Sequence, residues 1–189
     1  MAAYGTTGQR CTAPRRIIVV RSVAEELVSL LAAETAKITV GPGDAAGVDV
    51  GPLIDARALA DVSAQLDRAL EEGAVVAAQG TSVGDASGYF LEPTLLADVT
   101  PEMTIAQDEV FGPVLPVLTV EDYAEAMDVA RSTRYGLSTS IYTRDLSTAI
   151  CFMHETDSGV VHINKPPIGA ESHLPFGGLK ESSLGAKEL

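Results

Sequence analysis

Cys11 is the residue whose type and neighbours most directly suggest covalent chemistry. It lies in the run Gly8-Gln9-Arg10-Cys11-Thr12-Ala13, just before an apolar segment. A thiol attacks as its thiolate, and a nearby cation favours that form. Arg10 supplies a positive charge one residue away, and Gly8 allows a close approach of the backbone. The alternative on residue types alone is a buried, unreactive cysteine, which is what we predict for Cys151.

Glu109 is the second candidate, in Glu109-Val110-Phe111-Gly112-Pro113. A carboxylate beside a Gly-Pro turn can accept two hydrogen bonds from a diol such as ribose, although a solvated loop glutamate remains the alternative. The segment 175–180, with the sequence PFGGLK, has two glycines after an aromatic residue. These glycines let the main chain and the ring approach a ligand or a neighbouring loop, and a simple surface turn is the alternative. The spacing of the three histidines predicts no metal site.

The charge of the chain argues against several classes of partner. Lys and Arg number 13 against 26 Asp and Glu, which gives a net charge of -13. Nucleic acids and anionic membranes require dense positive charge, so we predict neither as a partner. No apolar run approaches the ~18 residues of a membrane span, and the N-terminus lacks the features of a signal peptide. Two widely separated cysteines form no disulfide framework and indicate a reducing compartment, here the cytoplasm.

Strand-like and helix-like segments alternate along the chain. Strands are predicted at 15–20, 75–77, 137–142 and 159–164, and Pro93 makes 89–96 extended. Helices are predicted over about 22–37, 55–73, 121–131 and 145–155. Ser22 and Glu25 match a capping box, and Asp55 and Asp145 match simple N-caps. The alternation predicts an α/β fold of three layers, with a mostly parallel sheet and helices on both faces.

Six segments, in order along nearly the whole chain, together resemble the NAD(P)-dependent aldehyde dehydrogenases. They are 8–13 followed by Arg16, 50–54, 92–94, 109–113, 135–137 with Asn164, and 175–180. The first resembles the nucleophile motif of the family and the last resembles its late signature loop. Ser182-Ser183, where many relatives have Ser-Gly, resembles the branch that acts on 2,5-dioxovalerate (α-ketoglutarate semialdehyde).

The resemblance implies an oxidation of an aldehyde to a carboxylic acid with NAD or NADP. Cys11 would form a thiohemiacetal and then, after loss of hydride, a thioester. Glu109 would hold the nicotinamide ribose, and Phe111 would pack near that end of the cofactor.

The resemblance also implies a binding site for the substrate, a small aldehyde. The Ser182-Ser183 variant suggests that this aldehyde carries a carboxylate. Phe176 would form a wall of the aldehyde tunnel. Lys165 and Pro167 belong to a loop, 165–168, that would shape the substrate end. By the same resemblance, we expect a homo-oligomer.

The domain organisation follows from what precedes the nucleophile in this family. Its cofactor-binding fold, its general-base glutamate and an oxyanion-hole asparagine lie upstream, whereas ten residues precede Cys11 here. We therefore predict a single catalytic domain over 1–189, without the N-terminal cofactor-binding domain and the C-terminal oligomerisation strand, and inactive alone as a dehydrogenase. Two alternatives remain. One is a non-catalytic truncated remnant that acts only by association, and the other is a thiol hydrolase, for which Cys11 lacks an evident triad partner.

Overall fold

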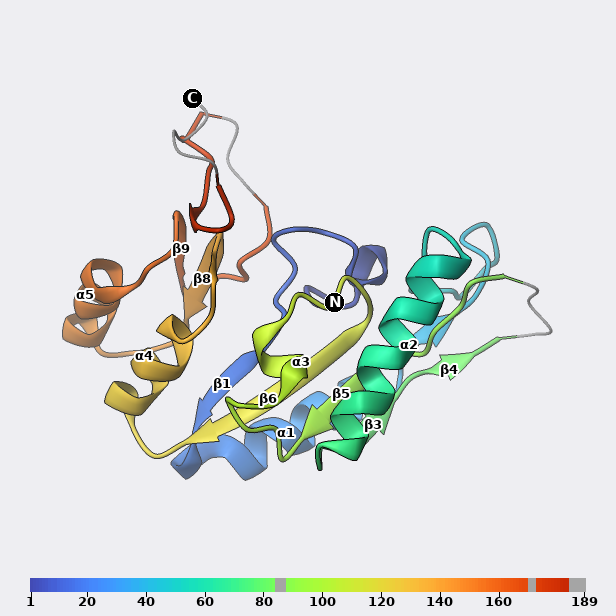
Figure 1. Ribbon diagram of the computed structural model, residues 1–189, viewed down its shortest axis with the longest axis horizontal. Helices are drawn as coiled ribbons and strands as arrows, with labels where there is room; N and C mark the ends of the chain where they lie inside the picture. The colour runs from blue at the N-terminus through green and yellow to red at the C-terminus, as the bar shows by residue number, and fades with distance from the viewer. Residues whose placement is uncertain (84–87, 170–172, 184–189) are drawn as a thin grey trace.

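The main sheet of the protein has four strands in the order β1-β6-β5-β3 (Figure 1). The computed structural model describes residues 1–83, 88–169 and 173–183. The strands are β1 (Ile17–Val20), β6 (Val114–Val120), β5 (Thr94–Ala97) and β3 (Val75–Gln79). β6 pairs in parallel with both β1 and β5, whereas β3 is antiparallel to β5. The predicted α/β class with a mostly parallel sheet is confirmed. The last residues of the chain, 184–189, lie outside the described residues.

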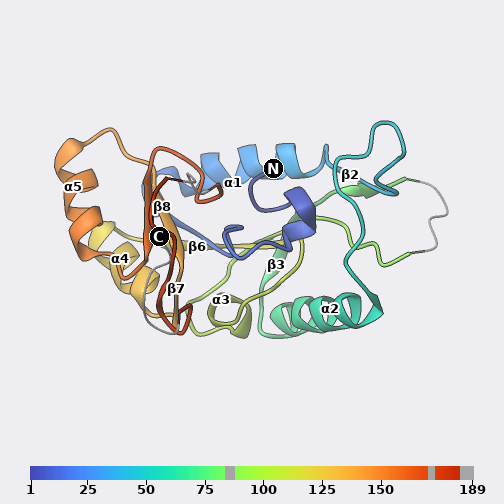
Figure 2. The same cartoon turned by 90° about the horizontal axis from the view of Figure 1, so that it is seen from above.

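Helices cover both faces of this sheet, as Figure 2 shows. α1 (Arg21–Thr35) lies on one face, and α2 (Ala56–Glu71) with the short α3 (Thr104–Gln107) lies on the other. Successive strand residues point to opposite faces. Leu95 and Leu115 accordingly belong to the core under α1, while Leu96 and Val114 belong to the core under α2 and α3. The two cores confirm the predicted three layers.

The central strand β6 is absent from the strands predicted from the sequence. Its seven residues, VLPVLTV, are buried except Thr119, so they form one apolar run without the alternation of a half-buried strand. Pro116 also argues against a central strand, because proline cannot donate a ladder hydrogen bond. The structure nevertheless pairs Pro116 with Leu96 of β5. Burial on both faces therefore explains the missed strand.

A second group of elements lies at the β1 end of the main sheet (Figure 1). It contains α4 (Tyr123–Arg131), α5 (Leu146–Glu155) and the parallel pair β8 (Ser138–Ile141) and β9 (Val160–Ile163). β7 (Tyr135–Gly136) pairs antiparallel with β10 (Leu179–Lys180). Two further short strands, β2 (Thr39–Val40) and β4 (Thr81–Ser82), pair in parallel at the other end. A 3-10 turn, η1 (Gly5–Gly8), precedes β1.

The helix caps agree with the predictions at two of three positions. The side chain of Asp55 accepts a hydrogen bond from the Ala58 backbone N–H at the start of α2, and Asp145 caps α5 in the same way. The Ser22 capping box is wrong. β1 continues directly into α1 at Arg21, so Ser22 is already inside the helix and no side chain caps its start.

Cys151, predicted to lie in the core, is exposed. α5 buries only Ala149 and Phe152, because it covers the second group of elements from one side.

None of the helices among the described residues combines the length and apolar character needed to cross a bilayer.

Candidate active site

Cys11 is exposed in a turn that follows an unusual left-handed segment. Thr6, Thr7 and Gly8 have φ values of 57°, 58° and 67°. A non-glycine residue in this region costs roughly 1–2 kcal/mol, so other contacts must hold the segment. The buried Thr7 side chain supplies one of them, since its Oγ1 donates to the carbonyl oxygen of Gly51 at 3.0 Å.

The Cys11 segment (residues 6–13) packs directly on the Glu109 segment (residues 109–113). A Cβ atom added to Gly8 would lie 2.1 Å from the Gly112 carbonyl oxygen, and one added to Gly112 would lie 2.6 Å from Val62 of α2. Two positions more than a hundred residues apart are thus in backbone contact, and glycine is required at both because no side chain fits. The structure therefore brings the predicted nucleophile and the predicted ribose ligand into one region.

Arg15, which the sequence did not single out, connects these two segments. Its Nη1 donates to the carbonyl oxygens of Gly8 at 2.6 Å and Val110 at 2.7 Å. Its Nη2 donates to the Arg10 carbonyl oxygen at 2.5 Å and lies 3.7 Å from Glu109 Oε1. The guanidinium also lies 4.9 Å from the centroid of the Phe111 ring. Arg10, the cation expected beside Cys11, is exposed, and Arg15 supplies a second, largely buried cation to the same segment.

The two consecutive arginines immediately before β1 have different partners. Burial lowers the pKa of Arg15, and the electrostatic interaction of its guanidinium with the Glu109 carboxylate opposes that decrease. Arg16 donates to the carbonyl oxygens of Ala106 and Ala130 at 3.2 and 3.0 Å. Burial lowers its pKa too. Arg16 therefore connects β1 to α3 and α4, whereas Arg15 connects the segments of the candidate site. The sequence shows two consecutive arginines, but it does not indicate which of them contacts the Cys11 and Glu109 segments.

A groove of about 640 Å³ opens between the Cys11 segment, α2 and the Glu109 segment. Its lining residues are Thr6, Gln9, Ile54, Ala58, Asp61, Val62, Gln65, Glu109 and Phe111. The Glu109 side chain is 39% exposed and Phe111 is 43% exposed. A carboxylate that remains open to the groove, next to an accessible ring, suits a diol linked to a planar group. Glu109 and Phe111 could therefore hold one end of a nicotinamide cofactor.

The predicted substrate loop follows β9 and is fixed to β8 by its backbone. The carbonyl oxygens of Lys165 and Pro167 accept hydrogen bonds from Ser140 Oγ at 2.5 Å and Ser138 Oγ at 2.8 Å. The Lys165 residue is exposed. The backbone path of the loop is thus defined, and the roles of Lys165 and Pro167 stay predictions.

The glycines of segment 175–180 serve packing between chain segments. A Cβ atom added to Gly159 would lie 1.8 Å from the Gly177 carbonyl oxygen, and one added to Gly178 would lie 2.7 Å from Ser182 Cβ. The Ser182 Oγ accepts a hydrogen bond from the Gly136 N–H at 3.0 Å. Of the two roles predicted for these glycines, the approach to a neighbouring loop is the one the structure shows. Phe176 is half-buried here, and its role in a tunnel stays a prediction.

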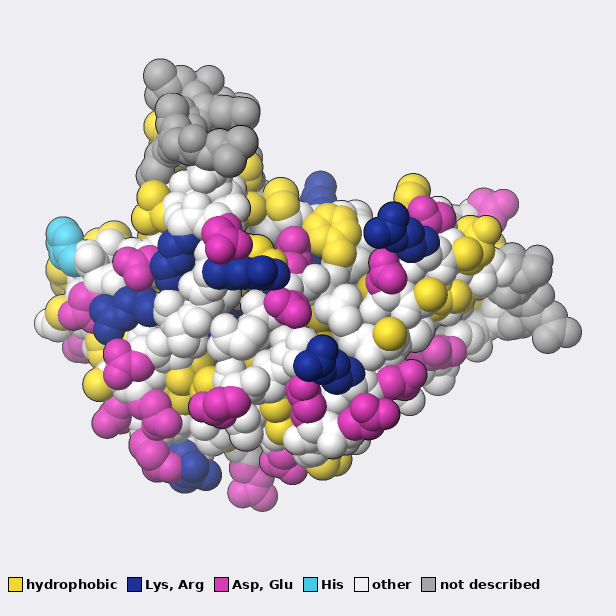
Figure 3. Space-filling model, viewed as in Figure 1, with side chains coloured by type: hydrophobic (Ala, Val, Ile, Leu, Met, Phe, Trp, Pro, Cys, Tyr) yellow, Lys and Arg dark blue, Asp and Glu magenta, His cyan; other side chains and the backbone are white. Residues whose placement is uncertain are grey.

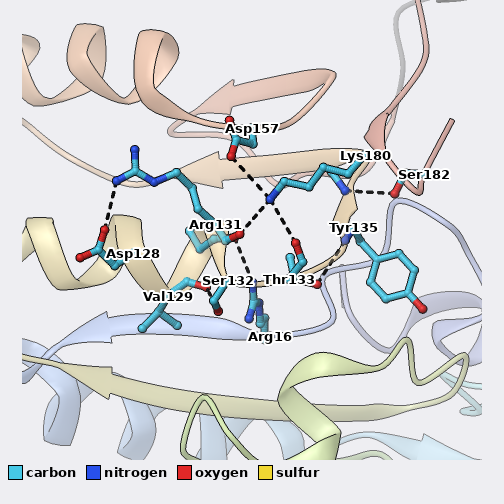
Figure 4. Close-up of polar contacts among 12 residues, drawn as sticks. Arg16, Asp128, Val129, Arg131, Ser132, Thr133, Tyr135, Asp157, Lys180 and Ser182 are labelled. Atoms are coloured by element: carbon cyan, nitrogen blue, oxygen red, sulfur yellow. Dashed lines mark hydrogen bonds and ion pairs between the residues drawn. The ribbon is translucent and has the colours of Figure 1, made fainter. Parts of the chain in front are cut away.

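Lys180, at the end of this segment, has a structural environment (Figure 4). Its Nζ donates to the carbonyl oxygens of Arg131 at 2.8 Å and Thr133 at 3.1 Å, and lies 3.5 Å from Asp157 Oδ2. A cation at the carboxyl end of α4 satisfies carbonyls that have no partner within the helix. Lys180 thereby joins β10 to α4.

The fold and the site together define a class of protein. A three-layer α/β domain presents an exposed cysteine beside a groove with an accessible carboxylate, as in oxidoreductases that use a cysteine and a nucleotide cofactor. The model of the aldehyde dehydrogenase family matches residues 1–189. The chain belongs to the aldehyde dehydrogenase family.

Individual relatives agree with this assignment. The chain is 44% identical over 183 residues to the alpha-ketoglutarate semialdehyde dehydrogenase of Haloferax volcanii, covering 95% of this chain and 38% of the relative. It is 35% identical over 189 residues to the alpha-ketoglutaric semialdehyde dehydrogenase of Bacillus subtilis, covering 98% and 39%. The lactaldehyde dehydrogenase of Escherichia coli superposes with a TM-score of 0.92 at 34% identity, covering 99% and 39%. The chain thus spans about two fifths of the length of these relatives.

Proposed function

We propose that this chain carries the nucleophile and part of the cofactor site of an NAD(P)-dependent aldehyde dehydrogenase. The observation that supports it best is the packing of the exposed Cys11 segment on the Glu109 segment through Gly8 and Gly112. A nucleophile and a cofactor-holding carboxylate must lie in one region for hydride to leave the substrate carbon. We further propose a catalytic domain over residues 1–189 within a cytoplasmic homo-oligomer.

The chemistry of this chain begins at Cys11. The thiolate sulfur forms a bond to the aldehyde carbon, and the carbonyl oxygen takes a proton to give a thiohemiacetal. The backbone N–H of Cys11 stabilises the developing oxyanion. Glu109 would accept hydrogen bonds from ribose hydroxyls, and Phe111 would pack at that end of the cofactor. Bound NAD(P) would supply the acceptor for the hydride that leaves the thiohemiacetal carbon, while the hydroxyl proton leaves to solvent. Water would then release the acid from the Cys11 thioester and restore the thiol.

The test is protection of Cys11 by an aldehyde. The purified chain is treated with iodoacetamide, with and without an aldehyde, and the alkylated peptides are quantified by mass spectrometry. We expect the aldehyde to slow alkylation of Cys11 and to leave Cys151 unaffected. Both cysteines are exposed, so Cys151 serves as an internal reference for accessibility. Protection of Cys11 that is kept in Cys151→Ser supports the proposal, whereas equal alkylation with and without aldehyde favours the non-catalytic alternative.

We also propose that the substrate is an aldehyde with a distal carboxylate. The two curated relatives described above are named for α-ketoglutarate semialdehyde, and Lys165 places a cation in the predicted substrate loop. The test compares the concentrations of succinate semialdehyde and butyraldehyde that half-protect Cys11. A lower value for the carboxylated aldehyde, lost in Lys165→Met, supports the proposal. Equal values for the two aldehydes contradict it.

A further inference from the structure

Arg15 contacts both halves of the proposed site from a single side chain. Three carbonyl oxygens accept its hydrogen bonds, two in the Cys11 segment and one at Val110. On the groove side, the same guanidinium faces the Glu109 carboxylate and the Phe111 ring. The side chain is only 18% exposed. A charged group becomes this buried only where its partners compensate for the lost hydration.

The shape of the guanidinium matters as much as its charge. A planar fork donates in several fixed directions, whereas a lysine ammonium is a compact point charge on a flexible stem. Nη1 alone bridges Gly8 and Val110, one residue from each of the two segments. Lysine in this place would preserve the charge and lose the bridging geometry.

The left-handed segment before Cys11 increases the need for such a bridge. Thr6 and Thr7 hold positive φ values without being glycine, and a strained conformation persists only where its surroundings determine it. Arg15 donates to the carbonyl oxygen of Gly8, the residue that ends this segment. Without that contact, the end of the left-handed segment would lose its hydrogen-bonded link, through Arg15, to Val110 of the Glu109 segment.

We propose that Arg15 is a positioning residue that holds the Cys11 turn at a defined place relative to Glu109 and Phe111. The inference rests on the proposed function, because it assigns Arg15 a role in aligning nucleophile and cofactor. Reacting atoms must approach within about 3–3.5 Å, and a misplacement of about 1 Å can cost on the order of a hundredfold in rate.

The experiment compares Arg15→Ala and Arg15→Lys in the 189-residue chain. Arg21→Ala is the control, because it removes an exposed guanidinium that pairs with Glu121 away from the site. The first measurement is the concentration of succinate semialdehyde that half-protects Cys11 from iodoacetamide, with the alkylation rate without aldehyde as its reference. The second is amide hydrogen exchange over residues 8–11 and 109–112.

We expect Arg15→Ala to raise the half-protecting concentration about tenfold, because the hydrogen bonds that hold the Cys11 turn against the Glu109 segment are lost. The alkylation rate without aldehyde should stay nearly unchanged, because Cys11 is exposed. Arg15→Lys keeps the charge without the bridging geometry and should change the half-protecting concentration in the same direction. Both variants should accelerate exchange in both segments, and Arg21→Ala should change neither measurement there.

Three results would overturn the proposal. They are unchanged exchange in both segments in Arg15→Lys, an equal effect of Arg21→Ala on these segments, or an unchanged half-protecting concentration in Arg15→Ala. If Arg15→Ala does not fold, the exchange of Arg15→Lys decides alone. Failure of the proposed function shows separately, as absence of aldehyde protection of Cys11 in the unmodified chain.

Discussion

At the scale of single residues, Glu109 combines an ion pair with Arg15 and exposure to the groove. We expect Glu109→Gln to leave the fold intact, because partly exposed pairs contribute at most about 1 kcal/mol. Hydride transfer should slow by about tenfold or more, since charge-assisted hydrogen bonds are worth ~1.5–3 kcal/mol each. The measurement is single-turnover kinetics after fusion of the chain to a cofactor-binding domain. Glu25→Gln, on the far side of the sheet in α1, is the control. Equal rates for the two variants would show that Glu109 holds no ribose.

Tyr4 gives a prediction about pH. Burial raises the pKa of its phenol from 10.0 to about 12, although its hydroxyl lies 3.4 Å from Thr35 Oγ1. The folded protein therefore favours the neutral phenol, and this contribution is present below pH 10 and lost as the pH rises toward 12. The loss should amount to about 2–3 kcal/mol in the free energy of unfolding. Urea titrations across this range should show a smaller decrease in Tyr4→Phe, and an identical decrease would contradict the assignment.

At the scale of elements, the contact between the η1 turn and the Glu109 segment requires glycine at position 8. In Gly8→Ala, the new Cβ would overlap the Gly112 carbonyl oxygen at a residue with positive φ. We expect a loss of at least about 2 kcal/mol in unfolding free energy and changed alkylation of Cys11. Gly5→Ala is the matched control, because nothing lies within 4 Å of its added Cβ. Similar stability of the two variants would refute the close backbone contact.

The start of α2 affects the groove, since this helix forms one wall. Asp55→Ala removes the side chain that accepts from the Ala58 N–H and should cost about 1 kcal/mol. Ser22→Ala in α1 should cost much less, because no side chain caps the start of that helix. Thermal unfolding of both variants measures the difference. A larger loss of stability in Ser22→Ala than in Asp55→Ala would support the Ser22 capping box, which the structure contradicts.

At the scale of the whole molecule, two features matter for activity: the charge of the surface and the share of its relatives' length that the chain matches. The face in Figure 3 shows carboxylates spread between single basic side chains, as the net charge of -13 requires. The chain matches 38% of the Haloferax volcanii relative, and its groove offers Glu109 and Phe111 to a cofactor.

We therefore expect the 189-residue chain alone to bind NAD only in the millimolar range or more weakly, and to produce no NADH from aldehydes. A bound nicotinamide must be held within about 3–3.5 Å of the reacting carbon, which two side chains alone cannot ensure. Calorimetric titration with NAD and an aldehyde-dependent NADH assay provide the test. Micromolar binding with steady turnover would contradict the expectation.

The sequence by itself determined the local features of this protein. The α/β class, the ends of α4 and α5, and the caps at Asp55 and Asp145 were predictable, because each depends on periodicity or hydrogen bonds within a few residues. Cys11 and Glu109 were proposed as site residues from motifs that run in order along the chain, and their roles stay predictions. These signals are short-range, so they are visible without the fold.

Only the tertiary structure decided what depends on contacts between distant segments. β6 becomes the central strand because both its faces are covered, although Pro116 and an unbroken apolar run hid it. Arg15, which precedes β1, joins the Cys11 segment to the Glu109 segment, because its guanidinium reaches the carbonyl oxygens of both Gly8 and Val110. Cys151 is exposed because α5 is covered on one face only. Which arginine is buried, and which helix face is covered, depends on packing partners that no local pattern contains.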